Sequence, residues 1–301
     1  MSQLAFRNPL TGLDEEMENL RSILAAVYAY PEAFSLERID LFGRSSPLTG
    51  ELGGDHVVFV DFARRFDLDR RIAEARAAGR EEIAARLATN RGKVGVLVAD
   101  VSGHSMTDTL LAAMLHQAFL VGVLYELEHS GHVTTKLFEI LNTRFYQSSS
   151  VTKYVTMVYG EISEDGTFRF ISAGHPRPLI YSAAFGRFVE LDGAGLVSVP
   201  PIGLFPTEGD VDRAMAGWVG TESPRQRINE VRLLGDGDVL LLYTDGASDQ
   251  VGGDLAGALT PTMARVSGLS AREIVEALHA EIVGRHAPVD DVTLVAIKRR
   301  A

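Results

Sequence analysis

Cysteine is absent from this chain, and basic residues are outnumbered by acidic ones. Without cysteine, disulfide bonds, thiolate metal sites and cysteine nucleophiles are excluded, and a reducing compartment is the default. The chain carries 40 Asp and Glu against 29 Lys and Arg, for a net charge of −11. Nucleic-acid backbones are bound by clustered Lys and Arg, and anionic membranes repel an acidic surface. We find no apolar run of membrane-spanning length and no secretory signal. We therefore expect a cytoplasmic protein that binds neither nucleic acid nor a membrane.

The composition is that of a globular protein with a substantial core. Of the 301 residues, 46% are hydrophobic and 23% are charged, which is an ordinary balance. Apolar residues recur at helical spacing from Leu20 to Tyr28, and Pro31 ends the pattern. We therefore divide the chain into an N-terminal helical segment, 1–35, and a main domain, 36–301. The apolar face of the helix leaves two alternatives open, a homodimer or regulatory contact and packing on its own domain.

A charged insertion interrupts the first half of the main domain. The segment 64–91 is rich in Arg, Glu and Ala and is broken once by Gly79, so it predicts a helical hairpin between two strands. One interpretation is a solvated excursion. The other is a lid or docking element that lies near the functional site, because the two strands that it joins both carry candidate ligands.

Short strands separated by turn signals dominate the second half. DG, GHP, FG and GDG separate the apolar segments, and few helical patterns lie between them. This order differs from the regular strand–helix alternation of a doubly wound parallel sheet and favours antiparallel sheets with grouped helices. The predicted strands cover 36–45, 56–63, 93–101, 154–163, 167–173, 177–183, 186–191, 228–234, 238–245 and 292–299. One long helix is predicted after the strand that ends at residue 101. Two further helices are predicted over 132–146 and 270–284.

Aspartates stand at the ends of several of these strands, next to glycine or to another aspartate. Carboxylates that meet at one site repel one another unless a cation neutralises them, and such hard oxygen ligands suit Mg²⁺ or Mn²⁺. Glycine beside them permits close approach of the backbone. A single Asp-Gly pair is most often only a turn, so the combination carries the signal. The positions are Asp55, Asp100, Asp245, Asp290 and Asp291.

The order of the motifs resembles a known enzyme family. GGD, VADVSGH, ISAGHPRPLIY, PPIGLF, GDVLLLYTDG and DDVTLVAI follow one another as in the SpoIIE-type branch of the bacterial type-2C, metal-dependent (PPM) serine/threonine protein phosphatases. The resemblance runs from about residue 36 to the C-terminus. It implies an α+β fold of two packed antiparallel β-sheets flanked by helices. It also implies a hydrolase that removes phosphate from phosphoserine or phosphothreonine with a hydroxide bridging two Mn²⁺ or Mg²⁺ ions.

The same resemblance implies roles for individual residues. Asp100 is expected to bridge the two ions, and the Val101 carbonyl is expected to complete the coordination of one of them. Asp245 and Asp290 are expected to hold the other ion, and Asp55 to bind or orient metal-bound water. All of them are therefore candidate catalytic or metal-binding positions.

Some positions depart from the family pattern or leave alternatives. Asp291 is the less expected ligand of the Asp-Asp pair, although the sequence does not decide which of the two faces the site. A second acidic residue is missing after GGD unless Asp61 replaces it. Ser105 stands where the family has glycine, and its hydroxyl can cap the following helix. His104 is expected to order its loop rather than to donate a proton, and His175 to serve a turn.

The resemblance also suggests a partner and leaves rival functions. Related phosphatases act on phosphoserine in small anti-sigma-factor antagonists within partner-switching pathways, so such a protein is the expected substrate. The main alternative is a catalytically inactive scaffold with the same fold. GGD also occurs in diguanylate cyclases, but that interpretation leaves YTDG and DDVT unexplained.

Overall fold

The computed structural model describes most of the chain beyond residue 33. The described residues are 18–19, 22–24, 34–48, 53–103, 105–148, 153–191, 195–209, 221–233, 235–284 and 286–300. Residues 22–24 are helical, and the rest of the helix predicted for 20–28 lies outside the described residues. The division at residue 35 and the role of the N-terminal segment therefore stay predictions.

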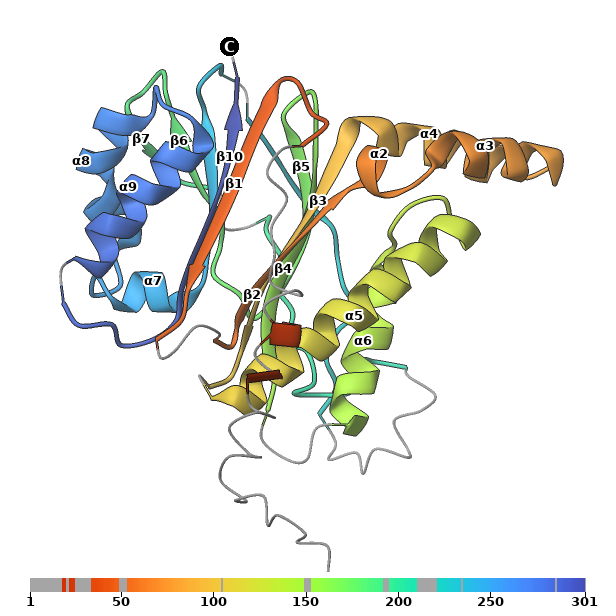
Figure 1. Ribbon diagram of the computed structural model, residues 1–301, viewed down its shortest axis with the longest axis horizontal. Coiled ribbons are helices and arrows are strands. Elements are labelled where there is room, and N and C mark those ends of the chain that lie inside the picture. The colour runs from red at the N-terminus through yellow and green to blue at the C-terminus, as the bar shows by residue number, and fades with distance from the viewer. Residues whose placement is uncertain are drawn as a thin grey trace, which may run out of the picture.

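Two five-stranded antiparallel sheets form the centre of the molecule (Figure 1). The first sheet has the order β1 (Ile39–Ser46), β10 (Val292–Arg299), β9 (Val239–Tyr243), β6 (Leu179–Ser182) and β7 (Arg187–Val189). The second has the order β2 (Asp55–Asp61), β3 (Lys93–Val101), β4 (Val155–Ser163), β5 (Thr167–Ala173) and β8 (Asn229–Arg232). The predicted α+β fold of two packed antiparallel sheets is confirmed.

The alternation of side chains along each strand separates an inner from an outer face. In β2, Val57 and Phe59 belong to the apolar cluster between the sheets, whereas Val58 and Val60 belong to the cluster beneath the helices. In β3, even-numbered positions such as Val98 face the other sheet. By the same period, Asp55 and Asp100 lie on the inner face, where the inter-sheet core ends.

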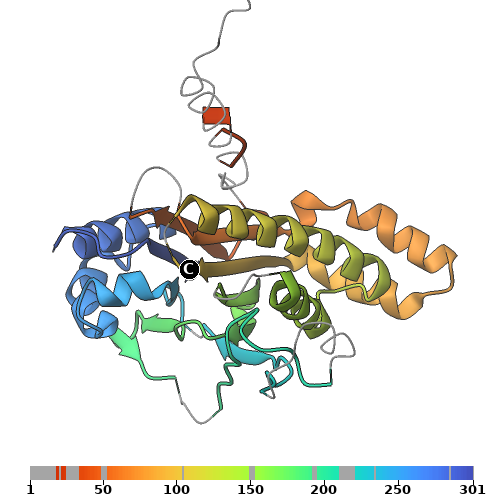
Figure 2. The same cartoon turned by 90° about the horizontal axis from the view of Figure 1, so that it is seen from below.

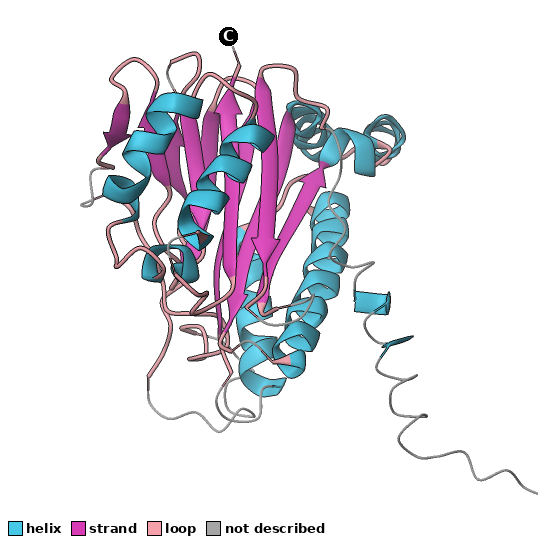
Figure 3. Cartoon of the chain, turned by 60° about the vertical axis from the view of Figure 1, so that its left-hand side comes forward, coloured by secondary structure: helices cyan, strands magenta, loops and turns pink. Residues whose placement is uncertain are grey.

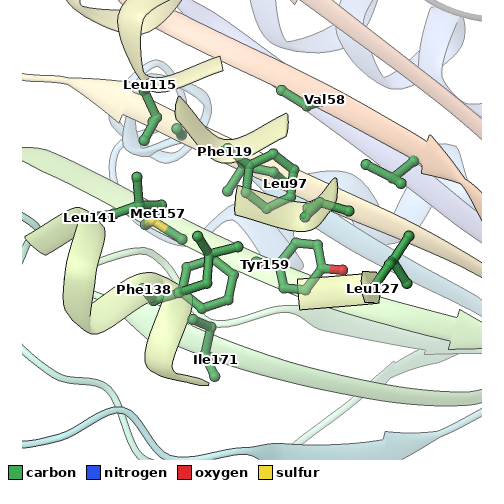
Figure 4. Close-up of a cluster of buried hydrophobic side chains, with 14 of the residues drawn as sticks. Val58, Leu97, Leu115, Phe119, Leu127, Phe138, Leu141, Met157, Tyr159 and Ile171 are labelled. Atoms are coloured by element: carbon green, nitrogen blue, oxygen red, sulfur yellow. The ribbon is translucent and has the colours of Figure 1, made fainter. Parts of the chain in front are cut away.

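Helices cover the outer face of each sheet (Figures 1 and 3). The helices α8 (Leu255–Val266), α9 (Ala271–Val283) and the short α7 (Asp245–Asp249) lie on the first sheet, and α5 (Met106–His129) and α6 (Thr135–Ser148) on the second. Beneath α5 and α6, the rings of Phe119 and Phe138 lie 5.2 and 5.1 Å from that of Tyr159 (Figure 4). The sequence analysis did not predict α7 or α8. A proline inside α8, Pro261, gives that segment the pattern of a loop.

The expectation that no apolar run reaches membrane-spanning length is wrong for α5. Residues Thr107–His129 have a mean hydropathy of 1.6 in their most apolar window, so length and composition alone would let this helix cross a membrane. In this fold 39% of that window is buried, and the helix packs on β2, β3 and α6. The core helix of a globular domain has the same composition, so the finding is weak evidence for a membrane span.

The charged insertion is helical, as predicted, but it lies far from the aspartates. It comprises α2 (Phe62–Arg65), α3 (Leu68–Ala77), α4 (Glu81–Thr89) and a 3₁₀ turn at Asn90–Gly92, which extend from the body beside α5 (Figures 1 and 2). The register pairs Asp55 with Asp100 and Asp61 with Val94. Six residue steps of about 3.3 Å separate the two pairs by about 20 Å. The expected position near the site is therefore wrong.

Asp61 does not replace the missing acidic residue after GGD for the same reason. It lies at the insertion end of β2, where its carboxylate accepts hydrogen bonds from the backbone N–H (2.6 Å) and hydroxyl (2.7 Å) of Ser35 and caps α2 through Arg64 N (3.2 Å). The Asp61 carboxylate therefore caps α2 and also holds the segment before β1 in place through its hydrogen bonds to Ser35.

The insertion should contribute to stability and leave the aspartate site unaffected. Leu87 is 2% exposed in the apolar cluster that the insertion shares with α5. We expect Leu87→Ala to lower the free energy of unfolding by about 2–5 kcal/mol through the lost contacts and the remaining cavity. Arg76→Ala, an exposed control on α3, should change it by less than about 0.5 kcal/mol. Denaturant unfolding tests both, and a changed divalent-metal affinity in Leu87→Ala would contradict the separation of the insertion from the site.

Candidate active site

The strand register places three polar side chains in one row across the second sheet. Asp55 begins β2, Asp100 lies near the end of β3, and Thr156 near the start of β4. Asp100 is directly opposite Asp55 on one side and Thr156 on the other. Opposite residues in antiparallel strands project from the same face, about 5 Å apart. The row therefore faces the first sheet at the end of the inter-sheet core.

The first sheet completes the site from the end of β9 and the start of β10. Asp245 is the first residue of α7, directly after the buried Thr244. The Thr244 hydroxyl donates to Asp55 Oδ2 at 2.7 Å, and the Thr293 side chain also hydrogen-bonds Asp55. Sequence reasoning missed both threonines, although they stand beside the motif aspartates in YTDG and DDVT.

Asp291 is buried and bound to the loop that precedes β2. Its carboxylate accepts hydrogen bonds from the backbone N–H groups of Leu48 (2.5 Å), Gly54 (2.7 Å) and Asp55 (3.3 Å). A Cβ atom on Gly53 would lie 2.2 Å from Asp291 Oδ2, so this position requires glycine. Asp291 thus holds the GGD loop against β10.

The backbone around Val101 is held from two directions. Val101 N donates to Gly54 O at 3.3 Å, and a Cβ on Gly54 would lie 2.8 Å from the Val101 carbonyl oxygen. From the segment just before β4, Lys153 Nζ donates to Ser102 O at 2.7 Å and lies 2.8 Å from Asp108 Oδ1. These contacts fix the backbone conformation at the end of β3, where the Val101 carbonyl lies.

The predicted cap at Ser105 is confirmed. Ser105 precedes the first residue of α5, and its backbone N–H and its hydroxyl donate to Asp108 Oδ2 at 2.9 and 2.6 Å. The carboxylate of this capping box also pairs with Lys153, so the start of α5 and the start of β4 share one buried acidic group.

The aspartates shift one another's pKa upward. Burial, followed by the charges of Asp245, Asp290 and Asp291, raises the pKa of Asp100 to about 7. Burial and then Asp100 raise the pKa of Asp55 well above its ordinary value. Burial and then Asp290 raise the pKa of Asp245. Asp100 thus interacts electrostatically with Asp55 on one side and with Asp245 and Asp290 on the other.

The donor set fits divalent cations. Buried carboxylates with upward pKa shifts and no cationic partner among these causes are in the electrostatic state that a bound cation would relieve. Carboxylate and carbonyl oxygens are also the ligands that Mg²⁺ and Mn²⁺ prefer. Among the described residues, no group of three or more His, Asp or Glu side chains is already close enough to form a coordination shell.

Two of the motif histidines lie in the described structure, on opposite faces of the second sheet. His56 faces α5, as the strand period predicts, and its Nε2 lies 2.7 Å from His116 Nδ1. His175, expected to be only a turn residue, is 5% exposed, and its Nδ1 lies 3.0 Å from Thr156 Oγ1. His104 lies outside the described residues.

The fold and the site define a class. The chain has the fold of the PP2C-type phosphatases. It superposes on the PP2C phosphatase domain of SpoIIE from Bacillus subtilis with a TM-score of 0.57 and 16% sequence identity, covering 87% of this chain and 64% of that one. It superposes on RsbX, a structure determined in complex with magnesium, with a TM-score of 0.52 and 14% identity, covering 87% and 96% of the two chains. At these identities the likeness concerns the fold.

Within that class, the chain belongs to the SpoIIE family. The family model described as Stage II sporulation protein E (SpoIIE) matches residues 90–300. The phosphoserine phosphatase RsbP of Bacillus subtilis (strain 168) is 27% identical over 158 residues, which are 52% of this chain and 34% of that protein. The chain therefore spans about a third of the length of this curated relative.

The pKa shifts predict how metal-free stability depends on pH. Folded Asp100 keeps its proton up to about pH 7, whereas an unfolded aspartate releases it near pH 4. The folded state therefore binds more protons in this window, and the contribution of Asp100 to stability is lost as pH rises through it. We expect Asp100→Asn, compared with wild type in chelator, to be more stable at pH 8 by about 1–4 kcal/mol. Denaturant unfolding at pH 5 and pH 8 measures this, and an equal pH dependence in both proteins would contradict it.

The Asp290 and Asp291 side chains should respond differently to the same substitution. Asp291→Asn places an N–H group among backbone donors, and we expect the free energy of unfolding to fall by about 2 kcal/mol. In Asp290→Asn the Oδ1 atom that accepts from Asp291 N (2.8 Å) is retained, so stability should change by less than about 0.5 kcal/mol. Unfolding of the two metal-free variants makes the comparison, and equal losses would contradict the different roles.

Proposed function

We propose that this chain is a metal-dependent protein phosphatase that hydrolyses phosphoserine or phosphothreonine. The observation that carries the proposal is a set of acidic side chains, contributed by both sheets, whose pKa values are raised by burial and by one another, in a chain of the SpoIIE family. Structural ion-pair networks would hold such groups with Arg or Lys, but here the acidic groups raise one another's pKa.

The residues of the chain have different parts in the proposed site. Asp100 is the shared ligand of two ions, because its charge acts on both groups of acids. The Val101 carbonyl and Asp55 belong to one side, and Asp245 and Asp290 to the other. We leave Asp291 out of the ligand set, because its carboxylate is used by the GGD loop.

The chemistry follows from the charges that these residues hold. Two divalent ions, Mg²⁺ or Mn²⁺, would neutralise the phosphate oxygens and activate a water near neutral pH. Asp55 is buried and held by two threonine hydroxyls, so it suits orientation of that water rather than exchange of protons with solvent. The packed glycines at positions 53, 54 and 246 bring the loops close together. Positioning and electrostatic stabilisation account for most of the catalysis of phosphoryl transfer.

The finer substrate assignment rests on relatives. RsbP is a phosphoserine phosphatase, and the resemblance of the motifs points to a small anti-sigma-factor antagonist in a partner-switching pathway as the phosphorylated partner. The homodimer and the cytoplasmic location belong to the same proposal. The observations that support the location are the acidic composition and the absence of cysteine.

A catalytically inactive scaffold is the second candidate. The segment after GGD lacks a second acidic residue, since Val58 stands at that position and packs beneath the helices, and the described carboxylates form no ready coordination shell. A scaffold, however, would retain the cost of buried carboxylates without a cation.

A phosphatase assay with matched variants tests the proposal. Purified protein is incubated with p-nitrophenyl phosphate and with a phosphoserine peptide, with and without Mn²⁺, beside Asp100→Asn and Asp245→Asn. We expect Mn²⁺-dependent turnover in wild type and a loss of at least about 100-fold in both variants. Leu87→Ala serves as the control for a general loss of stability.

The outcomes separate the two candidate functions. Turnover that needs Mn²⁺ and both aspartates supports the phosphatase. If the wild-type protein neither hydrolyses the substrates nor binds Mn²⁺ in calorimetry, the phosphatase proposal fails and the scaffold is favoured.

A further inference from the structure

Thr156 is the non-acidic member of the row that contains Asp100. The two residues are directly opposite each other in β3 and β4, and the Thr156 side chain hydrogen-bonds the Asp100 carboxylate, which lowers the pKa of that carboxyl against the larger effects that raise it. A carboxylate accepts hydrogen bonds but does not donate them. When Asp100 is ionised, the single hydroxyl proton of Thr156 therefore points to its carboxylate.

Thr156 also contacts a buried histidine. Its Oγ1 lies 3.0 Å from His175 Nδ1. Because the Thr156 proton is used by Asp100, the oxygen must act as an acceptor toward the ring, and Nδ1 must carry the proton. The two contacts then form one directed chain, from His175 through Thr156 to Asp100.

The ring is held in place by the loop that carries it. Gly174 has a φ of +63°, and a Cβ there would lie 2.5 Å from Pro201 Cγ, so only glycine fits. Gly174 N donates to Val199 O at 2.7 Å. The AGHP motif is therefore a rigid turn that holds the imidazole next to Thr156 at the start of β4. This contact goes beyond the turn role that the sequence predicted.

The protonation of the ring is consistent with this direction. Burial lowers the pKa of His175 to about 3, against a smaller upward effect of the Tyr243 backbone, so the imidazole is neutral at pH 7 and has a single N–H. Within the described part of the chain, Nε2 makes no hydrogen bond of normal geometry. A proton on Nδ1 has an acceptor in Thr156 at 3.0 Å, whereas the Tyr243 backbone, which raises the pKa of the ring, makes no hydrogen bond of normal geometry with Nε2.

We propose that His175 and Thr156 are positioning residues for Asp100: the Nδ1–H group of His175 donates to Thr156 Oγ1, and the Thr156 hydroxyl donates to the Asp100 carboxylate. The pair orients the carboxylate that two ions would share, so this inference rests on the proposed function. Outer partners of this kind fix the direction of a metal ligand, and their loss lowers metal affinity about 10–100-fold.

The first test needs no metal. Long-range ¹H–¹⁵N spectra of the metal-free protein at about pH 8.5, above the pKa of Asp100, report which ring nitrogen of each histidine carries the proton. We expect His175 to be in the Nδ1–H form and Thr156→Val, which lacks the acceptor oxygen, to lose that form. An Nε2–H form in wild type, or an unchanged ring in Thr156→Val, would overturn the hydrogen-bond chain.

The second test measures Mn²⁺ affinity by calorimetry in paired variants. His175→Leu and Thr156→Val remove the chain, whereas His175→Asn keeps an N–H near the position of Nδ1 and Thr156→Ser keeps the hydroxyl. We expect about 10–100-fold weaker binding in the first pair and recovery to within about 3-fold of wild type in the second. His279→Leu is the matched control, because His279 is also 5% exposed but lies on α9.

The results distinguish failure of this inference from failure of the proposed function. If wild type binds Mn²⁺ and needs Asp100, while His175→Leu and Thr156→Val bind as tightly as His279→Leu, the positioning role is refuted and the phosphatase stands. Equal weakening in His175→Leu and His175→Asn would likewise refute it, because only packing would then matter. If wild type binds no Mn²⁺, the proposed function fails, and the ring spectra decide the hydrogen-bond chain alone.

Discussion

The antiparallel register of β2, β3 and β4 is the constraint on which the site depends. A shift of one residue in the β2–β3 pairing would turn Asp55 toward α5 and His56 toward the other sheet, because the side-chain period of a strand is two. The inner face is fixed by Val57 and Phe59, which pack between the sheets. The apolar core therefore specifies the register, and the register specifies which carboxylates meet.

The same core explains why the pKa values of the carboxylates are raised. The site lies where the apolar strands of both sheets end, so Asp55 and Asp100 lose water and gain no cationic side chain from the described residues in return. Burial is accordingly the largest cause of the upward pKa shift at both positions. The threonines on neighbouring strands donate only neutral hydrogen bonds, which offset part of this cost. Close packing stabilises the sheets and at the same time leaves negative charge that the protein alone does not neutralise.

The strand pattern predicted antiparallel sheets and marked aspartates at strand ends, and the resemblance of the motif order to the type-2C phosphatases implied the two packed sheets and the roles of those aspartates. Neither could separate Asp290 from Asp291, since Leu48, which donates to Asp291, lies 243 residues earlier in the chain. The contact between His175 and Thr156 was missed for the same reason, because the two residues lie in the loop after β5 and on β4. The misplaced insertion is different. Asp55 begins its strand and Asp100 nearly ends the next one, so the sequence already implied that their connection lies at the opposite end.

The two ends of β2 and β3 therefore serve different purposes. At the insertion end, the Asp61 carboxylate accepts hydrogen bonds from Ser35 and from the backbone N–H of Arg64 in the cap of α2. Its oxygens are therefore satisfied by backbone and hydroxyl donors. At the other end, the Asp291 carboxylate likewise accepts hydrogen bonds from backbone N–H groups of the GGD loop, but it stands beside aspartates that raise one another's pKa. A buried aspartate in this fold is thus structural when backbone N–H groups saturate its oxygens. It is a candidate ligand when its nearest charged neighbours are other carboxylates, and Asp100 meets that condition through Asp55 on the neighbouring strand and through Asp245 and Asp290 from the first sheet.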